Sequence, residues 1–98
     1  MAEQIGPWTT IGDPLGKGGN STVHRARRTD GSGPEVALKV LRRWRSPDRL
    51  RRFRDEIASL RSLRHEPGVL PLIDAHDPPV PSKRDRPWLA MPIAESLD

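Results

Sequence analysis

The stretch Leu15-Gly16-Lys17-Gly18-Gly19-Asn20-Ser21-Thr22-Val23 decides the fold of this chain, because it sets a glycine loop between two β-favouring runs. A second stretch, Val36-Ala37-Leu38-Lys39-Val40, places a lysine inside an apolar strand. Loops rich in glycine let backbone N–H groups approach an anion closely, and a lysine on a neighbouring strand adds a compact positive charge. The two stretches together predict a site for the phosphates of a nucleotide.

The composition indicates one small domain, or part of one, with a thin core. The 98 residues include 11 prolines and 8 glycines and are only 34% hydrophobic, which favours turns and loops over a helical bundle. Cysteine is absent, so neither disulfides nor thiolate metal ligands are available, and the three histidines share no metal-ligand spacing. We see no signal peptide and no apolar run of about 20 residues. We therefore expect a soluble, cytoplasmic protein without a metal site or a membrane partner.

The formal charge of +4 comes from arginines concentrated in residues 42–54. Such a cluster could attract nucleic acid or another acidic partner. Only two aromatic residues, Trp44 and Phe53, interrupt it, whereas single-stranded nucleic acid is usually bound by rows of stacking aromatics. We therefore interpret the cluster as a solvated helix face, and nucleic acid as an unlikely partner.

Residues 8–16, 22–28 and 35–41 predict three strands in succession. The first carries Thr9, Thr10 and Ile11, and the segment 16–20 between the first two strands is expected to be a hairpin turn. A turn cluster at residues 29–34 precedes the third strand, which contains the lysine. The three strands should be antiparallel neighbours.

A helix is predicted from about residue 47 to residue 64. Ser46 can cap it and Pro47 suits its first position. Helical spacing puts five apolar residues on one arc: Leu50, Phe53, Ile57, Leu60 and Leu63. Glu56 falls inside that arc, and a carboxylate facing a core is costly unless a cation meets it. We expect Lys39 to be that cation and to lie within salt-bridge distance of Glu56.

Residues 69–73 and 88–93 predict a fourth and a fifth strand, with a proline-rich, charged solvent loop at residues 77–87 between them. The expected fold class is α+β, a five-stranded antiparallel sheet with one main helix.

Spacing separates the known glycine–phosphate motifs. A P-loop needs a glycine five residues before Gly-Lys and a Ser or Thr after the lysine, whereas Ile11 and Gly18 occupy those positions. A dinucleotide fingerprint requires a helix directly after the glycines, whereas residues 21–26 are strand-like. Both motifs are excluded.

The remaining arrangement resembles the eukaryotic-type protein kinase family, whose loop reads G-x-G-x-x-G-x-V and whose third strand reads V-A-I-K. Gly16, Gly18 and Val23 match the loop, with Ser21 in place of its last glycine, and Val36-Ala37-Leu38-Lys39 matches the strand. Phe53-Arg54-Asp55-Glu56-Ile57 resembles the family's C-helix, and residues 88–94 resemble its fifth strand and hinge. The resemblance covers almost the whole chain, and the serine/threonine type is the commoner case of the family.

The resemblance implies an ATP-binding small lobe with roles for particular residues. Lys39 would hold the α- and β-phosphates while Glu56 orients it, and Val23 and Ala37 would cover the adenine. The loop over the phosphates would consist of Leu15, Gly16, Lys17, Gly18, Gly19, Asn20 and Ser21. In the hinge, at about residues 91–95, Met91 would be the gatekeeper, the carbonyl of Pro92 would accept from the adenine and the N–H of Ala94 would donate to it.

The same resemblance implies what residues 1–98 lack. The H-R-D-x-x-x-x-N and D-F-G motifs, which carry the catalytic base and the magnesium ligands, do not occur. We expect a partial kinase domain, a small lobe without its C-lobe, which transfers no phosphate by itself. Its partners would be ATP with magnesium, the missing lobe or an intact kinase, and a protein substrate only in the complete enzyme. The alternatives are a regulatory lobe that docks through Leu89, Met91 and Ile93, and, more weakly, a nucleic-acid-binding domain.

Overall fold

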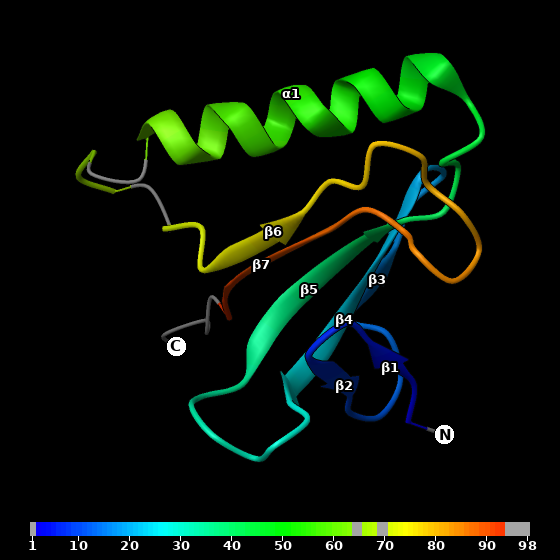
Figure 1. The fold of residues 1–98 in the computed structure, drawn as a ribbon. Coiled ribbons are helices and arrows are strands. Elements are labelled where there is room, and N and C mark those ends of the chain that lie inside the picture. The colour runs from blue at the N-terminus through cyan, green and yellow to red at the C-terminus, as the bar shows by residue number, and fades with distance from the viewer. Residues whose placement is uncertain (1, 64–65, 69–70, 94–98) are drawn as a thin grey trace.

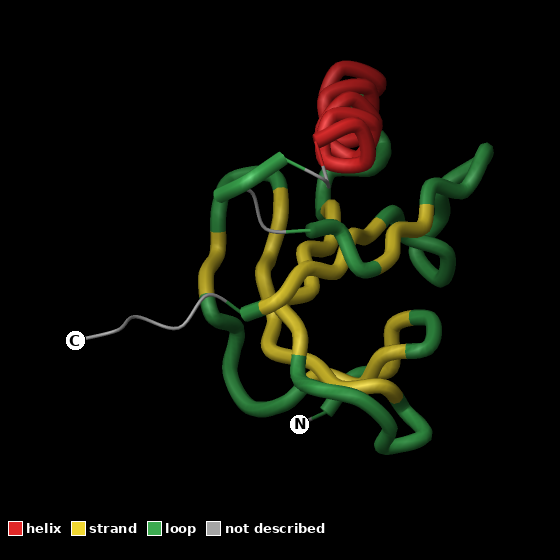
Figure 2. Tube along the Cα trace, turned by 90° about the vertical axis from the view of Figure 1, so that its left-hand side faces the viewer, coloured by secondary structure: helices red, strands yellow, loops and turns green. Residues whose placement is uncertain are grey.

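The computed structural model describes residues 2–63, 66–68 and 71–93, which form a curled antiparallel sheet with one helix across it (Figure 1). The strands are β1 (Gln4–Ile5), β2 (Trp8–Thr10), β3 (Gly16–Lys17), β4 (Ser21–Arg28), β5 (Val36–Leu41), β6 (Asp74–His76) and β7 (Trp88–Pro92), and the helix is α1 (Pro47–Leu63). The strand order is β1-β2-β4-β5-β7-β6, with β3 also paired to β4. Figure 2 looks nearly along α1 and shows the sheet curling beneath it. The α+β class and the single helix are therefore confirmed.

The prediction of five strands was wrong, and one reason lies in the segment between β2 and β3. Both strands pair with β4, where the sequence predicted a single strand over residues 8–16. Gly12 adopts a φ of 65° and Pro14 has no N–H to donate, so the ladder is interrupted between them. The N–H groups of Ile11 and Leu15 still donate to β4, at 2.7 Å each. β2 and β3 are thus two ends of one interrupted strand.

The last part of the sheet also differs from the prediction. The expected strand at 69–73 is replaced by β6, which begins at Asp74, and Val69 and Leu70 lie outside the described residues. Pro71 cannot donate to a ladder, and the first contact with β7 is the N–H of Ile73 on the carbonyl of Ala90, at 2.8 Å. β6 is an edge strand, which explains why it carries the polar residues Asp74 and His76.

The two faces of the sheet have separate cores, as the alternation of a pleated strand requires. Val36, Leu38 and Val40 of β5 face away from α1 and join a cluster completed by Ile5, Trp8, Ala26, Trp88 and Ala90. On the other face, Leu41 and Leu89 pack with Phe53 and Ile57 of the helix. Ala37 and Lys39 alternate with the first set, and so lie on the helix side.

The helix begins and packs largely as predicted. Ser46 caps it, because its Oγ accepts from the N–H of Arg49 at 3.4 Å, while its carbonyl accepts the first helical bond from the N–H of Leu50 at 2.9 Å. Leu50 and Leu60 pack partly buried against the helix-side core, whereas Leu63, the last residue of the helix, is 41% exposed and lies beyond the part of the arc that the sheet covers. Among the described residues, no helix has the length and apolar character needed to cross a membrane.

Candidate functional site

The predicted ion pair between β5 and α1 is present. The Lys39 Nζ atom lies 2.9 Å from Glu56 Oε1 and 3.1 Å from Oε2, so both carboxylate oxygens accept from one ammonium group. The two side chains are 30% and 38% exposed, which leaves the ammonium accessible to a ligand from the open side. The prediction followed from the phase of Glu56 on the helix, and the structure confirms that phase.

The glycine loop and the lysine share one hollow of about 440 Å³. Its lining is formed by Gly16, Lys17, Gly18, Gly19, Asn20, Ser21, Val23 and Lys39, eight of the residues predicted from the sequence. The turn closes where the N–H of Gly18 donates to the carbonyl of Ser21 at 2.9 Å. A smaller hollow of about 110 Å³ adjoins it beside the ion pair, and Arg49, Arg52 and Phe53 contribute to that one.

Strand register places the remaining predicted residues on the same face. Val23 of β4 is the partner of Lys39, and Ala37 of β5 is the partner of Met91 in β7. Residues directly opposite in an antiparallel pair project to one side of the sheet. Val23, Ala37, Lys39 and Met91 therefore form one patch on the helix side, although Ala37 and Met91 do not line the glycine-loop hollow.

Neither backbone conformation nor packing within the chain requires glycine at the loop positions. Gly16, Gly18 and Gly19 have no positive φ, unlike Gly6 or Gly31. A Cβ on Gly16 or Gly19 would meet no protein atom within 4 Å, and one on Gly18 would lie 3.6 Å from the Ser21 carbonyl. Open space above a loop of three glycines is the arrangement that close approach by a ligand requires.

Arginines that follow β5 hold the tip of this loop, and the sequence interpretation missed them. A guanidinium N–H of Arg42 donates to the carbonyl of Gly18, Arg43 Nε donates to that of Gly19 at 2.9 Å, and Arg49 Nη1 to Asn20 Oδ1 at 2.6 Å. The backbone N–H of Arg42 also donates to the Asn20 carbonyl at 2.8 Å. The pairing of Ser21 with Leu41 brings the two segments together, so the hairpin register was the signal that could have revealed these contacts.

The predicted hinge lies partly outside the described residues, because Ala94 is not among them. Pro92 and Ile93 line a hollow of about 540 Å³ with Arg25, Arg27, Pro34, Glu35 and Ile73. A hydrogen bond from Arg25, at 2.9 Å, lowers the pKa of the Glu35 carboxyl.

Leu15 lies at the start of the glycine loop and is 48% exposed. Leu89, predicted to belong to an open docking surface with Met91 and Ile93, is instead fully buried beneath α1.

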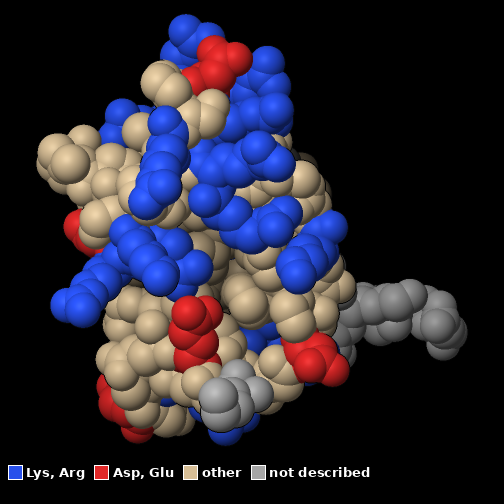
Figure 3. Space-filling view, turned by 90° about the vertical axis from the view of Figure 1, so that its right-hand side faces the viewer, with Lys and Arg blue, Asp and Glu red and all other residues tan. Residues whose placement is uncertain are grey.

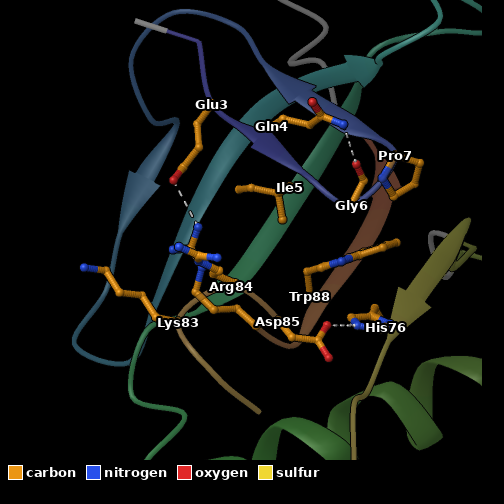
Figure 4. A pocket seen from close by; sticks show the side chains of 11 residues that line it. Glu3, Gln4, Ile5, Gly6, Pro7, His76, Lys83, Arg84, Asp85 and Trp88 are labelled. Carbon is orange, nitrogen blue, oxygen red and sulfur yellow. Dashed lines mark hydrogen bonds and ion pairs between the residues drawn. The ribbon is translucent and has the colours of Figure 1, made fainter.

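Another hollow, of about 500 Å³, lies beside the core that faces away from α1 (Figure 4). β1, Trp88 and residues 83–86 line it, and His76 Nε2 lies 2.5 Å from Asp85 Oδ1 there. None of the predicted nucleotide residues borders it.

Burial of the nearby His24 lowers the pKa of that imidazole. In the described part of the chain, no three His, Cys, Asp or Glu side chains form a metal-binding group.

No protein-family model matches the chain. The sequence is 40% identical over 80 residues to the DNA damage-responsive serine/threonine-protein kinase RqkA of Deinococcus radiodurans. The match covers 81% of this chain but only 11% of the relative. The similarity and the curled sheet with its single helix support a kinase-related N-terminal segment.

Proposed function

We propose that the chain is the ATP-binding small lobe of a serine/threonine-type protein kinase. The observation that carries the proposal is the ion pair of Lys39 and Glu56, which opens onto the glycine-loop hollow. A lysine fixed by a helix glutamate presents a defined ammonium to the α- and β-phosphates, as in protein kinases. Similarity to a bacterial serine/threonine kinase supports this assignment.

The phosphates would bind under the backbone of Gly16 to Ser21, where a Cβ on Gly16 or Gly19 would meet no protein atom. Backbone N–H groups of the loop and the Lys39 ammonium would give a polyphosphate charge-assisted hydrogen bonds. The adenine would lie against Val23 and Ala37, which share the helix-side face with Lys39. Met91 would border it as gatekeeper, and Pro92 and Ala94 would supply the hinge carbonyl and N–H.

Transfer of the γ-phosphoryl group to a protein hydroxyl is proposed for the complete enzyme only. The chain spans about a tenth of the relative it matches, and it contains neither an H-R-D loop nor a D-F-G motif. Magnesium would accompany the ATP phosphates and receive its protein ligands from those missing motifs. The cytoplasm, where ATP is abundant, is the proposed compartment.

The first prediction is weak, lysine-dependent nucleotide binding. Magnesium ATP titrated into the isotope-labelled chain should shift the amide NMR signals of Gly16, Gly18 and Lys39 with a dissociation constant of about a millimolar or weaker, equivalent to about 4 kcal/mol or less. Lys39→Ala should remove most of these shifts because it removes the ammonium that holds the phosphates. Arg61→Ala is the matched control, since it deletes one positive charge in the last turn of α1.

Two results would overturn the proposal. Unchanged loop signals at high ATP would remove the nucleotide role, and equal losses in Lys39→Ala and Arg61→Ala would reduce the effect to net charge. A radiolabelled transfer assay on a generic protein substrate should show no lysine-dependent transfer by the 98-residue chain.

A further inference from the structure

Five arginines form a positive surface at the start of α1, and three of them share a hollow with Trp44. We call it the basic surface, and its members are Arg42, Arg43, Arg45, Arg49 and Arg52. Figure 3 shows Lys and Arg side chains spread across the face that carries the beginning of the helix, with few acidic side chains between them. The concentration follows from the sequence, where all five fall within the eleven positions from 42 to 52.

The charges of the basic surface are not compensated. Five arginines elsewhere meet carboxylates: Arg25 and Arg27 contact Glu35, Arg51 contacts Asp48, Arg54 contacts Asp77 and Arg86 contacts Glu3. Within the described residues, no carboxylate lies within 4 Å of the five arginines of the basic surface. Arg42, Arg43 and Arg49 instead donate to neutral oxygens of the glycine loop, which leaves their full charge available.

A hollow gives this surface a shape. It measures about 660 Å³, within the ~300–1,000 Å³ range of small-molecule sites. Its lining is formed by Arg42, Arg43, Trp44, Arg45, Ser46 and Lys83. The Arg45 guanidinium stacks on the Trp44 ring at 4.9 Å from its centroid, so its position is defined on an aromatic surface. Trp44 itself is held in place against the helix-side core.

We propose that the basic surface docks a phosphorylated, acidic peptide segment of a protein partner. Planar guanidinium groups bind phosphate and carboxylate oxygens in pairs, and clusters of arginines are a recurring mode of phosphopeptide recognition. Nucleic acid fits less well, because Trp44 is the only aromatic ring available here and Phe53 is 3% exposed. The assignment does not depend on nucleotide binding.

Docking of the peptide would also affect the glycine loop, because Arg42 and Arg43 both line the hollow and donate hydrogen bonds to the loop. Arg42 and Arg43 donate to the carbonyls of Gly18 and Gly19 from the rim of the hollow. A phosphate in the hollow would compete for those N–H donors, since hydrogen bonds to a charged acceptor are about twice as strong as those to a neutral carbonyl. The bound peptide should therefore alter the amide signals of Gly18 and Gly19.

The test is fluorescence anisotropy with a labelled peptide in which one phosphoserine is flanked by glutamates, at physiological ionic strength. We expect binding to the wild-type chain, at least tenfold weaker binding of the unphosphorylated peptide, and a further loss in Arg45→Ala/Lys83→Ala. Both residues line the hollow and neither side chain donates a hydrogen bond to the glycine loop, so the fold and the loop should remain intact. Arg51→Ala/Arg61→Ala removes the same charge from two α1 residues outside the hollow and should bind normally.

Three outcomes would overturn the proposal. Equal losses in both double variants would reduce the effect to net charge, and no binding of the phosphopeptide at millimolar concentration would leave a solvated surface. Tighter binding of a 12-nucleotide single strand, with a steep dependence on salt, would assign the surface to nucleic acid. If the peptide binds while ATP does not, the docking proposal stands without the nucleotide proposal.

Discussion

Gly6 is the glycine whose identity the packing requires most clearly. Its φ is 58°, and a Cβ there would lie 3.2 Å from Nε1 of Trp88. Gly6→Ala should lower the free energy of unfolding by about 1–2 kcal/mol from the backbone alone, with a further loss from the displaced indole. Gly31→Ala is the control, because its φ of 81° also lies in the region that disfavours a side chain but its Cβ would meet nothing within 4 Å. Urea unfolding measures both, and equal losses would contradict the Trp88 contact.

At the same scale, the sequence predicted contacts that follow from the face of an element and missed those that depend on loop conformation. The pairing of Lys39 and Glu56 follows from helical phase and the cost of burying a carboxylate. The bond from Arg49 to Asn20 joins residues 29 apart, and it depends on how the turn and the segment after β5 meet. The spacing of the two residues does not indicate this contact, which becomes visible only once the register that sets Ser21 opposite Leu41 is known.

At the scale of elements, α1 is held mainly by Phe53 and Ile57, each 3% exposed. Phe53→Ala should cost about 3–5 kcal/mol, a large share of the ~5–15 kcal/mol typical of a domain, because it opens a cavity against Leu41 and Leu89. Leu63→Ala, in the exposed last turn, should cost less than about 1 kcal/mol. Thermal unfolding followed by circular dichroism compares the two. Similar losses would mean that the helix packs along its whole length.

The longer elements were predictable because their periodicity extends over many residues. α1, β4, β5 and β7 have nearly the predicted bounds. β1 has two residues and joins β2 through the tight turn at Gly6 and Pro7, so it is too short to show the alternation that marks a strand. The interruption after Thr10 and the shift to β6 both occur at glycine or proline, where a backbone donor or a regular φ is missing.

For the whole molecule, stability should fall in two stages as the pH decreases. Burial lowers the pKa of His24, so below about pH 6.5 the unfolded chain binds a proton that the folded chain does not, and stability is lost. Hydrogen bonds from Ser32 and Arg25 lower the pKa values of Asp30 and Glu35, and their contribution is lost below about pH 4.5. Urea unfolding across this range should show both stages. His24→Gln should abolish the first alone, and a pH-independent stability down to pH 5 would contradict the prediction.

The three tryptophans lie on both sides of the sheet, so their fluorescence can report on each side separately. Trp8 and Trp88 meet edge to face in the core that faces away from α1, with ring centroids 6.2 Å apart. Trp44 lies on the other side of the sheet among arginines. Iodide, an anionic quencher, is concentrated by those arginines and should reach Trp44 first, whereas caesium is repelled. The ratio of the iodide to the caesium quenching constant therefore measures the electrostatic potential at Trp44. This ratio will fall when any anion binds among the arginines. The emission of Trp8 and Trp88 meanwhile shows whether the sheet is still folded.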